Sequence, residues 1–240
     1  KISKFSTIKR RIASIKVVHK MRGHYLDAKH PIIMENLLGI KRVYGSFQNS
    51  KKPLLINDLK EIINVIDKKE KVEFKKIRNK SLILLGFSGG FRRSEIVDLE
   101  KEDLEFVKEG LKIFIKRSKT DQAGEGSIKA IPYFNNKQYC AVTKLKEWID
   151  FKNLSNGKIY DISDKSVSLI IKKYAMMAGL DPKQYAGHSL RSGFATSAAE
   201  AGAEERNIMA MTGHKTTQMV RRYINEANLF KNNALNKMKF

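Results

Sequence analysis

Apolar residues recur along most of the chain at spacings of three and four, the pattern of amphipathic helices. Ile8 and Ile12 begin one such stripe, and Ser6 or Thr7 is expected to cap its helix. Asn57 is expected to cap a later helix. The helices predicted in this way cover about residues 7–22, 32–44, 58–67, 71–87, 93–99, 142–154, 167–178, 188–201 and 204–211, followed by one that carries Tyr223.

Three short stretches replace the helical spacing with alternation and β-forming residues. They are Leu104–Val107, Leu111–Arg117 and Ile128–Tyr133. Lys108–Gly110 is expected to turn between the first two, and a longer connection with two glycines joins the second to the third. The sequence therefore predicts a mainly α protein with a small antiparallel β-sheet, in the α+β class.

The polar stretch Phe47–Pro53 interrupts the helical pattern and is typical of a linker. Before it the chain is basic, with Asp27 and Glu35 as its two acidic residues up to residue 50. We therefore expect a small helical domain over residues 1–50 and a larger domain over residues 51–240. Because the sequence begins with Lys1 and not Met, we expect it to be a fragment or a processed form of a longer protein.

The chain is strongly basic, because 47 Lys and Arg residues against 25 Asp and Glu residues give a formal net charge of +22. Such an excess favours a polyanionic partner such as a nucleic acid, whose phosphates bind Lys and Arg with release of counterions. The alternative is a solvated basic surface. The residues of the first domain expected to contact DNA are Lys9, Arg10, Arg11, Lys16, Lys20, Lys41 and Arg42.

Composition also argues against several classes of protein. A single cysteine, Cys140, excludes a disulfide framework and a Cys-rich zinc site, and it fits a reducing cytoplasm. We find no apolar run of about 18 residues and no signal-peptide layout, so no membrane partner is expected. Without a phosphate-binding G-x-x-x-x-G-K-[ST] loop, ATP is not expected either.

The last quarter of the chain holds most of the residues that could carry out catalysis. His188-Ser-Leu-Arg191 places an imidazole and a guanidinium three residues apart, on one helix face. Gly213-His214 follows, and Tyr223 comes nine residues after His214. Fixed cations suit a phosphodiester, which gains negative charge in its transition state, and a tyrosine hydroxyl can act as the nucleophile. This set predicts a site that cleaves a DNA backbone.

A further cation stands upstream in Gly90-Phe-Arg-Arg-Ser-Glu95. Together, G-F-R-R-S-E, H-S-L-R-S-G and T-G-H with Tyr223 nine residues on resemble the tyrosine recombinases, or phage-integrase family. The resemblance runs from about residue 54 to residue 229. It implies a recombinase catalytic domain preceded by a partial helical core-binding domain, and a DNA integration, excision or resolution activity through a 3′-phosphotyrosine intermediate.

The same resemblance assigns roles to single residues. Arg92 and Arg191 would hold the non-bridging oxygens, with Arg93 as the rival of Arg92 and as a DNA contact. Tyr223 would attack, His214 would donate to the phosphate, and His188 would manage the tyrosine proton. Lys119 would protonate the leaving 5′ oxygen, with Lys116 and Lys129 as alternatives. Glu95 would support the geometry of the histidines and arginines, or would form a purely structural ion pair.

No metal or other cofactor is expected, because protein cations replace divalent ions and the phosphotyrosine keeps the bond energy. The resemblance also implies a homotetramer on DNA, a monomer or weak oligomer alone, and a C-terminal helix 229–238 that docks on a neighbouring protomer. Two other functions remain open: a helix-turn-helix-like DNA-binding protein, or recombinase remnant, and a type IB topoisomerase.

Overall fold

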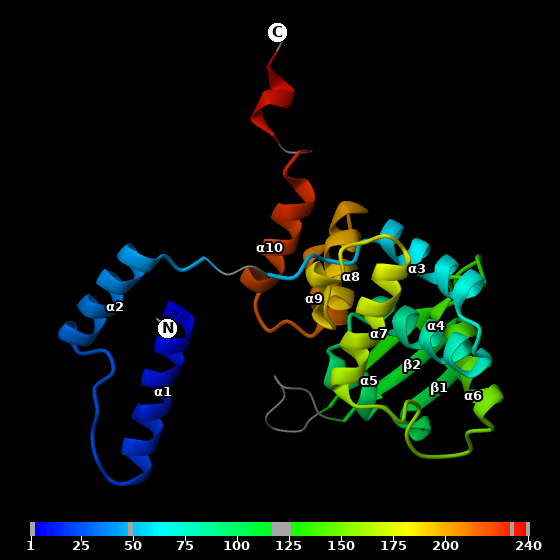
Figure 1. Cartoon of the computed structure of the whole chain (residues 1–240), viewed down its shortest axis with the longest axis horizontal. Helices are drawn as coiled ribbons and strands as arrows, with labels where there is room; N and C mark the ends of the chain where they lie inside the picture. The colour runs from blue at the N-terminus through cyan, green and yellow to red at the C-terminus, as the bar shows by residue number, and fades with distance from the viewer. Residues whose placement is uncertain (1–2, 48–49, 117–125, 231–232, 239–240) are drawn as a thin grey trace. The chain divides into compact units, whose positions relative to one another are not determined.

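The computed structural model describes residues 3–47, 50–116, 126–230 and 233–238. The chain divides into two compact units, Lys1–Ser50 and Lys51–Phe240. Helices dominate both units, and the strands form one three-stranded antiparallel sheet (Figure 1). This confirms the predicted fold class. None of the helices in the described part of the chain combines the length and the apolar character that a membrane span requires.

The first unit is a pair of helices, α1 (Phe5–Met21) and α2 (Pro31–Tyr44). The His30 side chain accepts a hydrogen bond from the backbone N–H of Ile32 and so caps α2. The capping residues predicted for α1 were wrong, because the helix begins after Lys4 and encloses both Ser6 and Thr7. No residue of α1 is buried: Ile8 and Ile12 are half-buried, and the later apolar residues Ile15 and Val18 are exposed.

Helices α3 (Ile56–Lys69), α4 (Glu73–Ser88), α6 (Ala141–Lys152) and α7 (Asp164–Met177) surround the main core of the second unit. The last ten residues of α4, Asn79–Ser88, are all buried, because α3, α6 and α8 (His188–Glu200) contact this helix. Because this part of α4 is buried all round, its apolar residues are not confined to one face of the helix. The predicted cap Asn57 was wrong, since α3 begins at Ile56 after Leu55.

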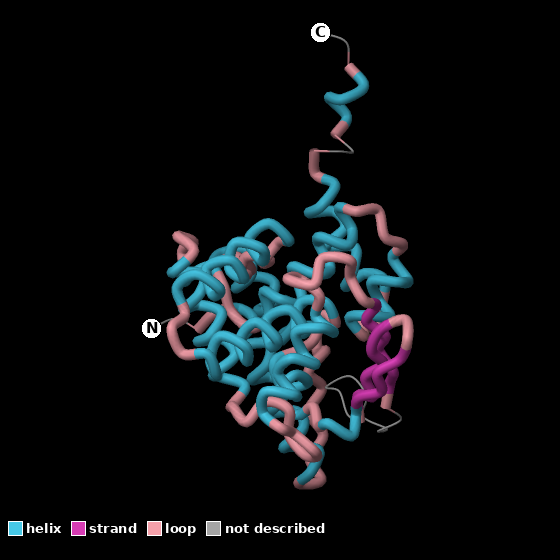
Figure 2. The backbone as a smooth tube through the Cα atoms, turned by 90° about the vertical axis from the view of Figure 1, so that its right-hand side faces the viewer, coloured by secondary structure: helices cyan, strands magenta, loops and turns pink. Residues whose placement is uncertain are grey.

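The sheet follows the order β1 (Leu104–Val107), β2 (Gly110–Ile115), β3 (Ser127–Pro132), shown in magenta in Figure 2. Along β3, Lys129 and Ile131 are buried while their neighbours are more exposed, as the two-residue period of a strand requires. Lys129 pairs with Ile113 of β2. Lys119 lies outside the described residues.

The C-terminal helices pack into a smaller apolar cluster. Helices α8, α9 (Glu205–Thr212) and α10 (Thr217–Asn228) meet at a cluster that includes Ala195, Ile208 and Val220. The predicted continuous helix over residues 229–238 was wrong for the residues described: α10 ends at Asn228, and the next element is the short 3-10 helix η3 (Ala234–Lys237). The remaining elements are α5 (Arg93–Asp98), η1 (Lys101–Asp103) and η2 (Pro182–Gln184).

Candidate active site

Arg92 stands at the start of α5, directly after the turn that ends α4. A carboxylate of Glu95, whose side chain is 4% exposed, accepts hydrogen bonds from the Arg92 backbone N–H at 2.9 Å and from Nη1 at 2.5 Å. Since α5 begins here, the acid also sits at the positive end of the helix dipole. These contacts fit the predicted role of Glu95 as a support for the arginine. In the described part of the chain, Glu95 forms no hydrogen bond with His188 or His214.

Arg191 is a buried cation on α8, 1% exposed. Its Nη1 donates to the Gly90 carbonyl at 2.9 Å, and its Nη2 is buried without a hydrogen-bond partner in the described part of the chain. Burial, and then the charge of Arg92, lower the pKa of Arg191 to about 10, so it remains charged at neutral pH. A buried guanidinium donor without an acceptor is costly, which favours an anion at this position.

His188 and Tyr223 meet where α8 packs against α10. The Tyr223 hydroxyl lies 3.4 Å from His188 Nε2, a length common in unliganded catalytic pairs. Burial lowers the pKa of His188 below its usual value of 6.5, and the neighbouring arginines, Arg191 first, lower it further. The imidazole is therefore neutral at pH 7 and able to accept a proton from the tyrosine.

His214 follows the left-handed residue Gly213, which ends α9, and its ring lies 5.9 Å from the Tyr223 ring between centroids. The buried Thr212 hydroxyl lies 2.6 Å from the Ile208 carbonyl and 2.7 Å from His214 Nδ1. A carbonyl only accepts, so the one hydroxyl proton goes to Ile208 and His214 Nδ1 is left to donate. The neutral ring then has an unprotonated Nε2.

Burial lowers the pKa of His214 to about 4, with further lowering by the charges of Arg191 and Arg92. In the unliganded site His214 is therefore a neutral ring at pH 7. An anion bound beside it would raise this pKa, because it favours the charged imidazolium. Only that form donates a hydrogen bond from Nε2 while Nδ1 donates to Thr212.

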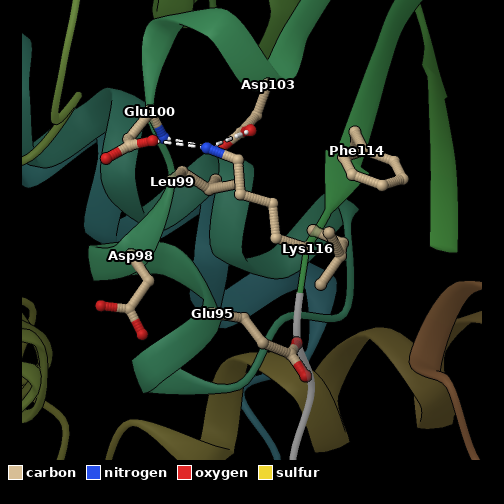
Figure 3. Close-up of a pocket in the computed structure, with 8 residues that line it drawn as sticks. Glu95, Asp98, Leu99, Glu100, Asp103, Phe114 and Lys116 are labelled. Atoms are coloured by element: carbon tan, nitrogen blue, oxygen red, sulfur yellow. Dashed lines mark hydrogen bonds and ion pairs between the residues drawn. The ribbon is translucent and has the colours of Figure 1, made fainter. Parts of the chain in front are cut away.

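The two alternatives to Lys119 occupy different places. Figure 3 shows Lys116 between Glu100 and Asp103, on the wall of a pocket of about 300 Å³ that Glu95 also lines. The Lys116 ammonium lies 2.5 Å from Glu100 and 3.0 Å from Asp103, which raises its pKa. A lysine committed to two carboxylates is a poor proton donor, so this alternative is the weaker one.

Lys129, by contrast, is 5% exposed and donates to the Gly89 carbonyl at 2.7 Å, directly beside the Arg92 turn. Burial and the charges of Arg191 and Arg92 lower its pKa to about 8, against a raising effect of Glu95. The sequence names this residue only as an alternative to Lys119. Its one signal is a lysine at a core-facing position of a strand.

Five of the six predicted catalytic residues therefore come together in one site of the second unit: Arg92, His188, Arg191, His214 and Tyr223. Within the described ranges, no group of three or more His, Cys, Asp or Glu residues could hold a metal ion. Arg93 is exposed and reaches Ser168 and Asp164 of α7. The residues of the first unit expected to contact DNA are all exposed: Lys9, Arg10, Arg11, Lys16, Lys20, Lys41 and Arg42.

Comparison with known proteins finds recombinases similar to this chain in sequence and in fold. Residues 53–229 match the phage integrase family. The chain is 41% identical over 251 residues to an integrase/recombinase XerD homolog of Selenomonas ruminantium, covering 98% of this chain and 73% of that protein. It is 30% identical over 154 residues to the tyrosine recombinase XerC of Syntrophus aciditrophicus, covering 61% of this chain and 48% of that protein.

Among solved structures, the XerA recombinase superposes with a TM-score of 0.61 at 18% identity, over 98% of this chain and 81% of that one. The XerH recombinase bound to its difH substrate gives the same TM-score at 18% identity, over 93% and 70% of the two chains. At such identities these two structures support the fold. The family match and the Selenomonas relative carry the assignment: this chain belongs to the phage integrase family of tyrosine recombinases.

Proposed function

We propose that the protein is a site-specific DNA recombinase that breaks and rejoins strands through a 3′-phosphotyrosine intermediate. The observation that carries this proposal is the Tyr223 hydroxyl beside a neutral His188, next to a buried Arg191 that has a donor without a partner. Nucleophile, base and anion-binding donor are the three groups that phosphoryl transfer to a tyrosine needs.

In the cleavage step, the Tyr223 oxygen attacks the phosphorus in line with the 5′ oxygen, and its proton passes to His188 Nε2. Arg92, Arg191 and a protonated His214 hold the non-bridging oxygens, where negative charge increases. The bond from phosphorus to the 5′ oxygen breaks, and Lys119 supplies the proton that this oxygen takes. Rejoining reverses each transfer with a 5′ hydroxyl as nucleophile, so the step needs no external energy source.

Strand exchange between two duplexes needs several protomers, and we propose a homotetramer on double-stranded DNA. The part of the tail that the structure describes exposes four large apolar side chains: Leu229, Phe230, Leu235 and Met238. A cavity of about 520 Å³ in the second unit, lined by Phe87, Ile131, Phe134, Phe194 and Met211 among others, offers apolar surface for them on a neighbouring protomer. We propose further that the protein acts on DNA in the cytoplasm, at the nucleoid.

A duplex with a nick close to the cleavage site tests the proposed chemistry. After cleavage the short 5′-hydroxyl fragment diffuses away, so the protein stays covalently attached to DNA. The wild type is expected to form this adduct and Tyr223→Phe to form none while still binding the duplex. Adducts of equal yield would overturn the role of Tyr223. Binding without an adduct in the wild type would favour a plain DNA-binding protein, and relaxation of supercoiled DNA without any special site would favour a topoisomerase.

A further inference from the structure

Lys129 lies at a position of β3 whose side chain points into the core, because alternate residues of the strand are buried. It is 5% exposed, it pairs with the fully buried Ile113 across the sheet, and Ile131 is the next residue on the same face. A buried ammonium is destabilising unless its donors are satisfied. The mechanism above assigns Lys129 no role, so its contacts need a separate account.

Those contacts are made with the turn that connects α4 to Arg92. The backbone N–H groups of Gly89, Gly90 and Phe91 bond back to carbonyls at the end of α4. The Gly89 carbonyl accepts from Lys129 Nζ at 2.7 Å, and the Gly90 carbonyl accepts from Arg191 Nη1 at 2.9 Å. Two cations from different elements thus hold two consecutive carbonyls of one turn.

Lys129 also fixes the side chain that closes this turn. Its Nζ lies 4.3 Å from the centroid of the fully buried Phe91 ring, close enough for a cation–π contact. The same ring fills the space next to Gly89, where a Cβ would lie 2.0 Å from a ring carbon. Arg92 is the next residue, so any movement of Phe91 changes the position of the Arg92 guanidinium.

Resting on the function proposed above, we propose that Lys129 is a positioning residue of the active site. Its charged ammonium holds the Gly89–Phe91 turn so that Arg92 faces the same phosphate as Arg191. It acts through the turn and does not touch the DNA. The opposing view is that Lys129 merely caps the negative end of α4.

The pH dependence of cleavage separates these two views. The charged groups that face Lys129 are Glu95 and Arg92 at the start of α5 and Arg191 on α8, and the titratable His214 lies before α10. With a pKa of about 8, Lys129 loses its charge just above neutral pH, and the cation–π contact is lost with it. In the unfolded chain a lysine titrates near pH 10.5. Between pH 8 and 10.5 the unfolded chain therefore binds more protons than the folded one, so the free energy of unfolding increases as the pH rises. Cleavage should therefore fall with rising pH while the contribution of Lys129 to stability rises.

Single-turnover cleavage of the nicked duplex tests the proposal. Two substrates are compared, one with oxygen and one with sulfur as the bridging 5′ atom of the phosphodiester that is cleaved. A thiolate leaves without a proton, so sulfur should restore activity to Lys119→Ala, the control that lacks the proposed proton donor. Lys129→Met should cleave about 100-fold more slowly with both substrates, the effect of a misplaced catalytic group. Lys129→Arg should recover most of the rate and lose the decline near pH 8, since arginine stays charged.

Thermal unfolding separates folding from positioning, because Lys129→Met replaces a buried charge with an apolar chain of similar size and should unfold at the same temperature or higher. Lys129→Met that cleaves at the wild-type rate would overturn the proposal. Rescue of this variant by sulfur would also overturn it, since Lys129 would then be the proton donor. A wild type that forms no adduct would instead overturn the proposed function, and this proposal with it.

Discussion

His188 Nε2 lies 3.4 Å from the Tyr223 hydroxyl, and the pKa of this histidine lies below 6.5 because of burial and the nearby arginines. The pair is thus set to move a proton from phenol to imidazole at neutral pH. Arg191 lies close to the same tyrosine, and the charge of a phenolate would favour the protonated guanidinium. One cationic site can therefore serve both the nucleophile and the phosphate.

His188→Gln should slow cleavage by about 10²–10⁴-fold, because the amide cannot accept the tyrosine proton. In the wild type the rate should fall as the pH drops below the lowered pKa of His188, where the imidazolium has no free lone pair. The variant should lose that acidic limb. Cleavage rates of both proteins from pH 5 to 8 are the measurement, and an unchanged acidic limb in His188→Gln would show that another group accepts the proton.

Thr212→Val removes the hydroxyl that orients His214 and keeps the buried shape. In the wild type, Nε2 must gain a proton to donate to phosphate, so DNA binding near pH 6 should take up protons. In the variant, the neutral ring is free to carry its proton on Nε2, and uptake should fall. Calorimetry of Tyr223→Phe with DNA, in two buffers of different ionisation enthalpy, measures the uptake.

Thr196→Val is the matched control for that prediction. It removes the hydroxyl of Thr196 on α8, which is buried like that of Thr212 but has no hydrogen-bond partner among the residues described. Proton uptake should therefore match that of the wild type. Equal uptake by Thr212→Val would mean that Thr212 does not set the tautomer of His214.

The same histidine affects stability. Its folded pKa of about 4 lies below its usual value of 6.5, so the unfolded chain binds more protons between these values. The contribution of His214 to stability is therefore present above pH 6.5 and is lost as the pH falls toward 4. His214→Gln should flatten this part of the curve of unfolding free energy against pH, which denaturant titrations at several pH values can follow.

Arg191→Met should separate activity from stability. Loss of the Gly90 contact and of the unpartnered donor should slow cleavage by about 10²–10³-fold, the effect of removing a transition-state donor. Replacement of a buried charge by an apolar chain is often neutral or stabilising, so the melting temperature should stay or rise. A variant that melts much lower but cleaves normally would show that Arg191 supports the fold and not the reaction.

The local pattern of the sequence predicted helices, strands and spaced motifs well, because each depends on neighbours within a few residues. Caps were less predictable: Asn57 prefers a cap position, yet α3 begins at Ile56, two residues before the predicted start. Leu55 takes the cap position instead, directly after Leu54, which is buried in the core. Lys116 and Lys129 look alike in sequence. They differ in their partners: Lys116 forms an ion pair with Glu100, and Lys129 donates to the Gly89 carbonyl. Both partners come from other elements and are brought near only by the tertiary structure.

Gly193 of α8 provides a test of the fold that holds the site. A Cβ there would lie 1.9 Å from the Leu54 carbonyl oxygen, and the Leu54 N–H already bonds to the Ser189 carbonyl one turn earlier in α8. Backbone atoms cannot yield as side chains do, so Gly193→Ala should cost about 3 kcal/mol of unfolding free energy. Because α8 carries both His188 and Arg191, cleavage should fall as well.

Gly39→Ala is the control, since it lies within α2 with nothing within 4 Å of the added Cβ. Alanine is the better helix former by about 1 kcal/mol, so this variant should be neutral or more stable. Chemical denaturation of both variants, with cleavage measured in parallel, checks the pair. If Gly193→Ala were as stable as Gly39→Ala, α8 would not pack on the Leu54 backbone, and the position of Arg191 beside Gly90 would need another explanation.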